Sequence, residues 1–233
     1  MSAPRTARDR VRDEVTKEIV GVARDHLAHE GAAALSLRAI ARDLQMAPSA
    51  LYRYFDGRDA LLSALILEAY TSLAEQAERA ADAAPTTAGD GERWLAVPRA
   101  MRSWALGRPH EWGLIFGSPV PGYRAPEATI APYARLAAAL VRPVRDALRA
   151  GRLSPGVTTA PPTPLDAALA PVREALLPGA STMTVLRTLQ GWSTLIGIID
   201  LELFGHWHNA VLDPDLLFEE TIRDAARWIG LRH

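Results

Sequence analysis

The chain has 233 residues, 48% of them hydrophobic and 23% charged, a balance that is typical of a globular protein with a buried core. It contains no cysteine, which excludes disulfide scaffolds, cysteine nucleophiles and thiolate metal centres. The formal net charge is −1, but residues 1–58 carry ten basic and eight acidic side chains. The first twelve residues hold four arginines against one aspartate. This basic start fits a polyanionic partner or a solubilising tail equally well.

The N-terminus is polar and charged where a signal peptide would need an apolar stretch. No run of 18 or more apolar residues occurs, so we expect no membrane span. The sequence therefore predicts a cytoplasmic protein.

Three helices are predicted in the N-terminal part. Apolar residues recur every three or four positions over Val11–Leu27, and Gly31 ends that helix. Ser36 is a suitable N-cap for a short second helix that ends near Leu44. After a three-residue turn, a third helix is predicted over Pro48–Phe55, with Pro48 at its first position and Leu51 and Phe55 buried.

The rest of the chain is also predicted to be helical. A segment over 151–164 is rich in proline and threonine and is expected to be flexible. The expected helices lie near 58–83, 93–106, 109–116, 127–150, 165–177, 181–204 and 213–229. The fold class is therefore all-α, with a three-helix head followed by a larger helical domain.

A helix, a three-residue turn and a short helix form the geometry of a helix-turn-helix. Because Leu51 and Phe55 are predicted to face inward, Tyr52, Arg53 and Tyr54 are left largely outward. Tyrosine hydroxyls and arginine can donate hydrogen bonds to phosphate, and arginine can also read guanine in the major groove. The pattern indicates DNA binding. For a single tyrosine, helix packing remains the better interpretation.

Three segments together resemble the N-terminal domain of tetracycline-repressor (TetR) family regulators: LRAIA at 37–41, ALYRYF at 50–55 and RDALL at 58–62. The resemblance covers about residues 8–68. It implies that some side chains face bases or nearby phosphates and that others hold the DNA backbone, with the arginine-rich N-terminal arm adding phosphate or minor-groove contacts. The first group is Arg38, Ser49, Ala50 and Arg53, and the second is Tyr52, Tyr54 and Arg58.

Three positions depart from the usual family pattern. Gln45 stands where glycine is usual in the turn, Ala47 where a serine or threonine cap is common, and Arg58 where lysine is usual. A non-glycine residue in a left-handed turn costs about 1 kcal/mol, and a missing cap costs a similar amount. These departures concern the geometry of the turn rather than the presence of the motif.

The resemblance divides the chain into a DNA-binding domain over 1–58 and an effector-binding and dimerisation domain over 59–233, in which 59–83 is a connecting helix. A segment over 112–123 is similar to part of the ligand domain in one branch of the family. Aromatic and polar side chains concentrate in this region, and they can line a ligand cavity or form plain core. The predicted ligand-binding residues are Met101, Trp104, His110, Trp112, Phe116 and Tyr123.

The last two long helices, 181–204 and 213–229, show broad apolar surfaces and occupy the place of the dimer-forming helices of the family. The resemblance therefore implies a homodimeric, ligand-responsive transcriptional regulator. We expect a repressor that a small molecule releases from a palindromic double-stranded DNA operator, with no cofactor, metal or enzymatic activity.

Two alternatives remain. Glu202 and His206 are four residues apart, and His208 is nearby, so a metal-binding or enzymatic helical protein with an incidental helix-turn-helix is one alternative. Solvated or locally bonded histidines at a polar helix end are the simpler interpretation, especially if Gly205 ends the helix. No GxSxG, P-loop, HExxH or GxGxxG signature occurs. A head-containing interaction protein that binds no DNA is the other alternative.

Overall fold

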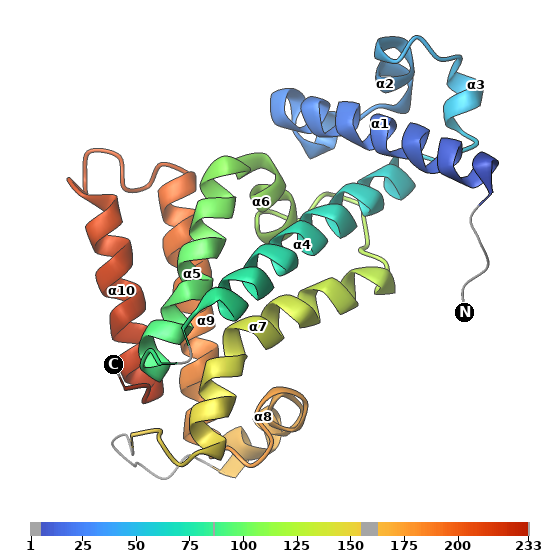
Figure 1. Cartoon of the computed structure of the whole chain (residues 1–233). Helices are drawn as coiled ribbons and strands as arrows, with labels where there is room; N and C mark the ends of the chain where they lie inside the picture. Colours follow the sequence, from blue (N-terminus) through green and yellow to red (C-terminus); the bar gives the residue numbers. More distant parts are fainter. Residues whose placement is uncertain (1–5, 86, 155–162, 233) are drawn as a thin grey trace. The chain divides into compact units, whose positions relative to one another are not determined.

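The computed structural model describes residues 6–85, 87–154 and 163–232, and within these ranges the regular structure is helical, without strands (Figure 1). The all-α prediction is confirmed. The chain forms two compact units. The head unit comprises residues 1–71 and 108–130, and the body unit comprises residues 72–107 and 131–233.

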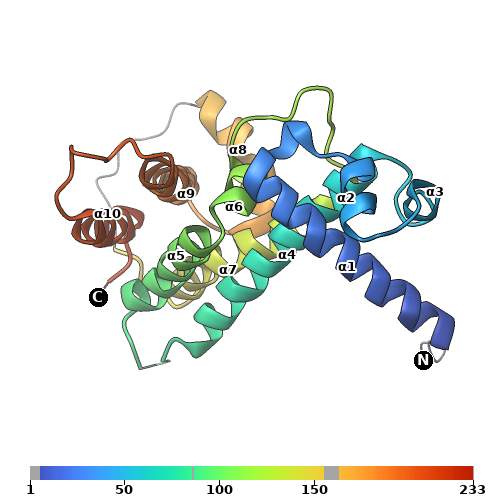
Figure 2. The same ribbon diagram turned by 90° about the horizontal axis from the view of Figure 1, so that it is seen from above.

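The head unit is built around the N-terminal helices. Its elements are α1 (Ala7–Glu30), the 3-10 turns η1 (Ala32–Ala34) and η2 (Glu127–Thr129), α2 (Leu37–Asp43), α3 (Pro48–Leu51), the first part of α4 (Arg58–Ala83) and α6 (Pro109–Phe116). Isoleucine and leucine side chains from α1, α2, α3 and α4 form one apolar core, for example Ile19, Ile40 and Leu51, each with no exposed surface. Figure 2 shows α2 and α3 following α1.

The compact head is larger than the predicted 58-residue domain. Leu114 and Ile115 of α6, together with Val120 and Tyr123 of the following loop, pack against the core that α1–α4 form. A segment distant in sequence is therefore part of the same apolar cluster. The division into DNA-binding and effector-binding roles at residue 58 stays a prediction.

The first helix begins earlier than its apolar stripe suggests. Thr6 caps α1 in a reciprocal capping box with Asp9, and Gly31 ends it with φ 78°. Arg8 and Arg10 therefore lie on the exposed first turn of a helix and not in an arm that precedes it, and Arg12 lies on the same helix, as predicted.

The third helix is shorter than predicted. Regular α-helix covers only Pro48–Leu51, because the N–H groups of Arg53 and Tyr54 bond to carbonyls three residues back instead of four. The predicted burial of Leu51 and Phe55 is confirmed, with exposed fractions of 0% and 7%.

The body unit holds the remaining part of α4 and five further helices among the described residues. These are α5 (Asp90–Gly107), α7 (Ile130–Arg149), α8 (Thr163–Leu176), α9 (Thr182–Leu203) and α10 (Pro214–Ile229). The predicted bounds of α4 are matched at both ends, and those of α9 and α10 to within one residue. Most of the predicted flexible segment, residues 155–162, lies outside the described residues.

Helices α9 and α10 lie side by side in both views (Figures 1 and 2). Gly191 permits this closeness, since a β-carbon there would lie 3.0 Å from the Ile229 side chain. Ser181 and Asp213 cap the two helices through their side-chain oxygens. Within the described residues, no helix has the length and apolar character needed to cross a membrane.

Candidate nucleic-acid interface

The connection between α2 and α3 is fixed by backbone hydrogen bonds. The N–H of Gln45 donates to the Arg42 carbonyl at 3.0 Å, and the N–H of Met46 donates to the Ala41 carbonyl at 2.8 Å. This is the Schellman pattern of a helix end, and it places Gln45 in the left-handed region with φ 54°. The predicted departure from a glycine-favouring turn is therefore real in the structure, and it leaves the helix-turn-helix intact.

The caps on either side of the turn contribute little. Ser36 stands at the N-cap of α2, as predicted, but its side chain makes no capping hydrogen bond. Ala47 stands at the N-cap of α3, and its methyl group cannot accept a capping hydrogen bond. The helix-turn-helix is held instead by the burial of Ile40, Ala41 and Leu51 in the head core.

Burial of Leu51 and Phe55 turns the opposite side of α3 and its following turn outward. Tyr52 is 51% exposed, and Arg38, Ser49 and Arg53 are exposed as well. Ala50, Tyr54 and Arg58 are half-buried. All seven predicted DNA-binding residues lie within the head unit, and the exposed members offer guanidinium and hydroxyl donors.

An arginine of α1 supports this turn. The Arg12 guanidinium donates to the Arg53 carbonyl at 3.3 Å and lies over the Tyr54 ring, 5.8 Å from its centroid. The sequence predicts Arg12 on the polar side of the first helix but does not reveal this contact. Its position on the same helix as Arg8 and Arg10 extends the basic surface next to the turn.

Arg58 has a structural contact that the sequence did not reveal. Its guanidinium donates to the Ala32 carbonyl at 2.8 Å and also reaches the Ala33 carbonyl at 3.4 Å. These bonds tie the start of α4 to η1 and satisfy turn carbonyls. The predicted phosphate contact of Arg58 stays a prediction.

A second tie holds α2 against α1. His26 Nε2 and Asp43 Oδ2 are 2.7 Å apart, and this hydrogen bond is the largest cause that lowers the pKa of the Asp43 carboxyl. The two residues are seventeen positions apart, so no local sequence pattern pairs them.

The six predicted ligand-binding residues fall in different units. Met101 and Trp104 belong to the body unit, and His110, Trp112, Phe116 and Tyr123 belong to the head unit. Met101, Trp104 and Trp112 are at most 1% exposed. The Trp112 and Phe116 rings are 4.5 Å apart, and Tyr123 lies 3.0 Å from Ser63 through its hydroxyl. Half of the set is thus packed as core, whereas Phe116 and Tyr123 are half-buried and His110 is exposed. The ligand role of the set stays a prediction.

The residues considered for a metal are held in other ways. Both Glu202 oxygens accept hydrogen bonds from Arg102, at 2.6 and 2.7 Å. Helix α9 ends at Leu203, and Gly205 has φ 77°, so His206 lies beyond the helix. Glu202 and His206 therefore do not share a helix face. Among the described residues, no group of three or more histidine and acidic side chains is arranged to hold a metal ion.

The exposed donors of Tyr52 and Arg53 follow a helix, a Schellman turn and a short second helix, on a unit whose first helix has basic first turns. This is the arrangement of a helix-turn-helix DNA-binding protein. Residues 19–65 match the family model of bacterial regulatory proteins of the tetR family. Residues 94–225 match the tetracyclin repressor-like C-terminal domain. The chain belongs to the TetR family of transcriptional regulators and is a DNA-binding regulator.

Named relatives agree with this assignment. The chain is 37% identical over 221 residues to the HTH-type transcriptional regulators Rv1816 of Mycobacterium tuberculosis and Mb1846 of Mycobacterium bovis, with 91% of this chain and 91% of each relative covered.

Solved structures show the same fold. The regulatory protein SCO4313 superposes with a TM-score of 0.76 at 39% identity, covering 96% of this chain and 98% of its own. The TetR family regulator PfmR of Thermus thermophilus gives a TM-score of 0.55 at 18% identity, with 91% and 96% covered.

Proposed function

We propose that the protein is a homodimeric repressor, that each head reads one half of a palindromic operator, and that a small molecule releases it from DNA. The exposure of Ser49, Tyr52 and Arg53 around the buried Leu51 carries this proposal. As such a regulator the protein would act in the cytoplasm and would need no catalytic activity or cofactor.

In this proposal the predicted DNA-binding residues fall into two groups. Arg38, Ser49, Ala50 and Arg53 face base edges or the nearest phosphates, whereas Tyr52 and Tyr54 hold the backbone. The guanidinium groups on the first turns of α1 add phosphate contacts, so operator affinity should fall steeply with salt through counterion release.

The outer face of α9 supports the homodimer. Four residues on it and the C-cap residue that follows have a spacing of four, three, four and three: Gln190, Thr194, Gly197, Leu201 and Phe204. Such a 3.5-residue repeat is the pattern of a helix that packs along a second helix, and the small Thr194 and Gly197 allow close approach.

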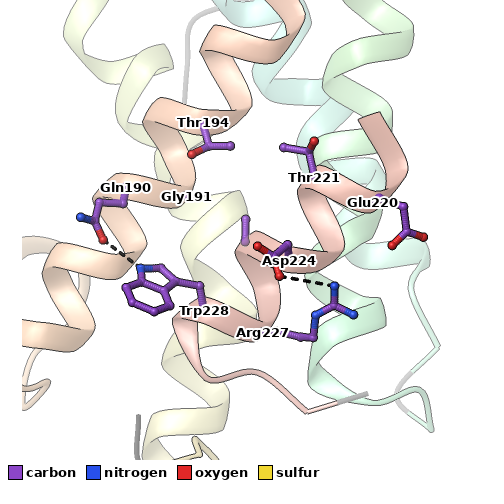
Figure 3. A pocket seen from close by; sticks show the side chains of 9 residues that line it. Gln190, Gly191, Thr194, Glu220, Thr221, Asp224, Arg227 and Trp228 are labelled. Atoms are coloured by element: carbon purple, nitrogen blue, oxygen red, sulfur yellow. Dashed lines mark hydrogen bonds and ion pairs between the residues drawn. The ribbon is translucent and has the colours of Figure 1, made fainter. Parts of the chain in front are cut away.

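A groove beside this stripe runs between α9 and α10 (Figure 3). Figure 3 shows Gln190 and Thr194 on one side and Thr221 and Trp228 on the other, with the Trp228 indole donating to Gln190 at 2.9 Å. Exposed apolar side chains lie at both ends of the helix pair, Trp228 at one and Leu201, Phe204 and Leu216 at the other. A twofold copy would bury both ends in a four-helix bundle.

Release by a ligand needs only a modest energetic bias. Two recognition helices on a twofold axis must lie about 34–36 Å apart to meet successive turns of B-DNA. A ligand that binds another spacing more tightly by about 3 kcal/mol weakens operator occupancy roughly a hundredfold.

The experiment begins with capture of bound genomic DNA, which should yield a palindrome. We expect Arg38→Ala and Tyr52→Ala each to weaken binding to that palindrome by about 1–3 kcal/mol, roughly five- to 150-fold, with the oligomeric state unchanged. Fluorescence anisotropy measures the affinity. Arg79→Ala, which removes an exposed arginine of α4 outside the interface, is the matched control and should bind as wild type. Wild-type affinity in both interface variants would refute the reading surface.

A further inference from the structure

The body unit contains an apolar cavity of about 170 Å³ among α7, α8 and α9. Helix α7 contributes Tyr133, Ala137, Leu140 and Val141 to its wall, and α9 contributes Val185, Thr188, Leu189 and Trp192; Val172, Leu176 and Leu177 complete it. None of the six residues predicted from the sequence to bind a ligand lines it.

The cavity wall carries no ionisable side chain except the Tyr133 phenol. Burial raises the pKa of that phenol, so the phenol stays neutral at physiological pH. The Thr188 hydroxyl donates its hydrogen to the Thr184 carbonyl at 2.8 Å, so this hydroxyl is not a free donor for a ligand. A charged occupant would lose its hydration without finding a counter-charge, which excludes it.

The size of the cavity sets the size of the occupant. Protein interiors are packed as densely as organic crystals, and voids larger than a water molecule are few. An engineered apolar cavity of about 150 Å³ stays dry and binds benzene or xenon. A cavity of about 170 Å³ with this wall therefore fits one molecule in the range of benzene and its small alkyl derivatives.

The walls of the cavity are held in place by contacts outside it. Asp166 near the start of α8 accepts hydrogen bonds from Arg173, at 2.6 Å, and from the Thr182 hydroxyl at the start of α9. Tyr133 and Trp192 meet edge to face with ring centroids 5.9 Å apart. Tyr133 is 41% exposed and also lines the cavity, so this ring pair forms part of the boundary with solvent.

We infer that this cavity is the effector site of the regulator and that it takes a small, neutral, apolar molecule. The effect on DNA rests on the proposed function, whereas the binding does not. Helix α9 connects ligand binding with the proposed dimer: Val185, Thr188 and Trp192 line the cavity, and the exposed Thr194 lies on the opposite side of the helix. An occupant that shifts α9 alters the helix proposed to set the spacing of the two heads.

The test uses the full chain with toluene as the neutral probe and benzoate as a charged probe of similar size. Calorimetry should show saturable binding of toluene and at least tenfold weaker binding of benzoate. Ala137→Leu fills the cavity and should weaken toluene binding at least tenfold. Ala134→Leu adds the same atoms on the exposed side of α7 and should bind as wild type. Equal binding to both variants, or no binding to wild type, would overturn the inference.

If Ala137→Leu fails to fold, Val172→Phe on α8 fills the same cavity, and crystals of the wild-type protein exposed to iodobenzene should show iodine density between Val172 and Val185. Iodine density found only at other places would overturn the assignment of this cavity as the binding site.

The effect on DNA is measured on the captured palindrome. Toluene should weaken the operator affinity of the wild type at least tenfold, and that of Ala134→Leu by the same factor. Binding by calorimetry without this loss would overturn the effector role. Failure of wild type to bind any DNA would instead count against the proposed function.

Discussion

Gln45 occupies a backbone position that favours glycine. Its φ of 54° brings the β-carbon close to the following carbonyl oxygen, which costs about 1–2 kcal/mol for a non-glycine residue. Part of that cost is regained because glutamine leaves the unfolded chain less flexible than glycine would. We therefore expect Gln45→Gly to stabilise the head by about 0.5–1 kcal/mol, measured by urea unfolding. Gln45→Ala keeps the β-carbon and should give no such gain; equal midpoints for the two variants would refute the argument.

Glu111 is a buried acid in the head, only 8% exposed. Burial is the largest influence on its carboxyl and raises its pKa above the ordinary value, although Arg24 and Arg108 lie 3.5 and 3.6 Å away and oppose the rise. The folded protein thus holds this proton more tightly than the unfolded chain does. Its contribution to stability is present below a pH of about 4.5 and is lost as the pH rises through the folded pKa.

The pH dependence can be isolated with Glu111→Gln, which removes the titrating group. The free energy of unfolding of the variant, relative to wild type, should increase as the pH rises upward from about 4.5. Urea unfolding at pH 4, 5, 6 and 7 measures this difference. A difference that decreases over that range would mean that the two arginines, and not burial, determine the direction of the Glu111 pKa shift.

At the scale of elements, Arg102 joins three helices of the body unit. From α5 it donates to both oxygens of Glu202 on α9 and, at 2.6 Å, to Asp215 on α10, while its guanidinium lies 4.8 Å from the centroid of the Phe218 ring. Hydrogen bonding to Glu202 is the largest cause that raises the pKa of the Arg102 guanidinium. The Arg102 and Glu202 side chains are only 14% and 15% exposed, so neither charge is well solvated if left alone.

We expect Arg102→Met to destabilise the protein by about 3 kcal/mol, because it leaves the Glu202 carboxylate buried and unpaired. The double variant Arg102→Met, Glu202→Met replaces the pair with apolar side chains and should recover most of that loss. Chemical unfolding of wild type and both variants measures the difference. A double variant as unstable as the single one would show that the pair itself, and not the orphaned charge, determines stability.

Long periodic elements were predictable and short ones were not. The bounds of α4 follow from the apolar spacing of Leu61, Leu65 and Leu73, which are all buried. Helix α3 is too short for periodicity to locate its end, and its bonding changes after Leu51. The capping role of Ser36 was predicted from residue type alone, whereas a cap also needs the side chain to reach an N–H group.

The candidate sites differ in the same way. The DNA-binding residues lie within one contiguous turn, so their exposure follows from which neighbours are buried. The cavity among α7, α8 and α9 depends on packing between residues as far apart in the sequence as Tyr133 and Trp192. No local sequence pattern indicates that Ala137 and Val172 line it. The concentration of aromatic side chains near residue 110 predicts the lining of a ligand cavity. However, Trp104 and Trp112 are large and 1% exposed or less, as core residues commonly are.

At the scale of the whole molecule, the proposed operator binding depends on two copies of the chain. Leu216 is 58% exposed at the start of α10, at the end of the helix pair where α9 presents Leu201 and Phe204. In a twofold dimer each substitution at this face occurs twice, so Leu216→Glu introduces two carboxylates into one apolar contact region. We expect its dimer dissociation constant to rise at least a hundredfold, about 2.7 kcal/mol, measured by sedimentation velocity.

The chain offers a matched control for this variant. Leu106 on α5 is 47% exposed and lies outside α9 and α10, so Leu106→Glu makes the same chemical change away from the proposed interface and should dimerise as wild type. Because one head contacts only one half-site, the monomeric Leu216→Glu should also lose most of its affinity for the full palindrome while binding a single half-site as wild type does. A wild-type chain that is monomeric at micromolar concentration, or a Leu216→Glu variant that dimerises normally, would contradict this interface.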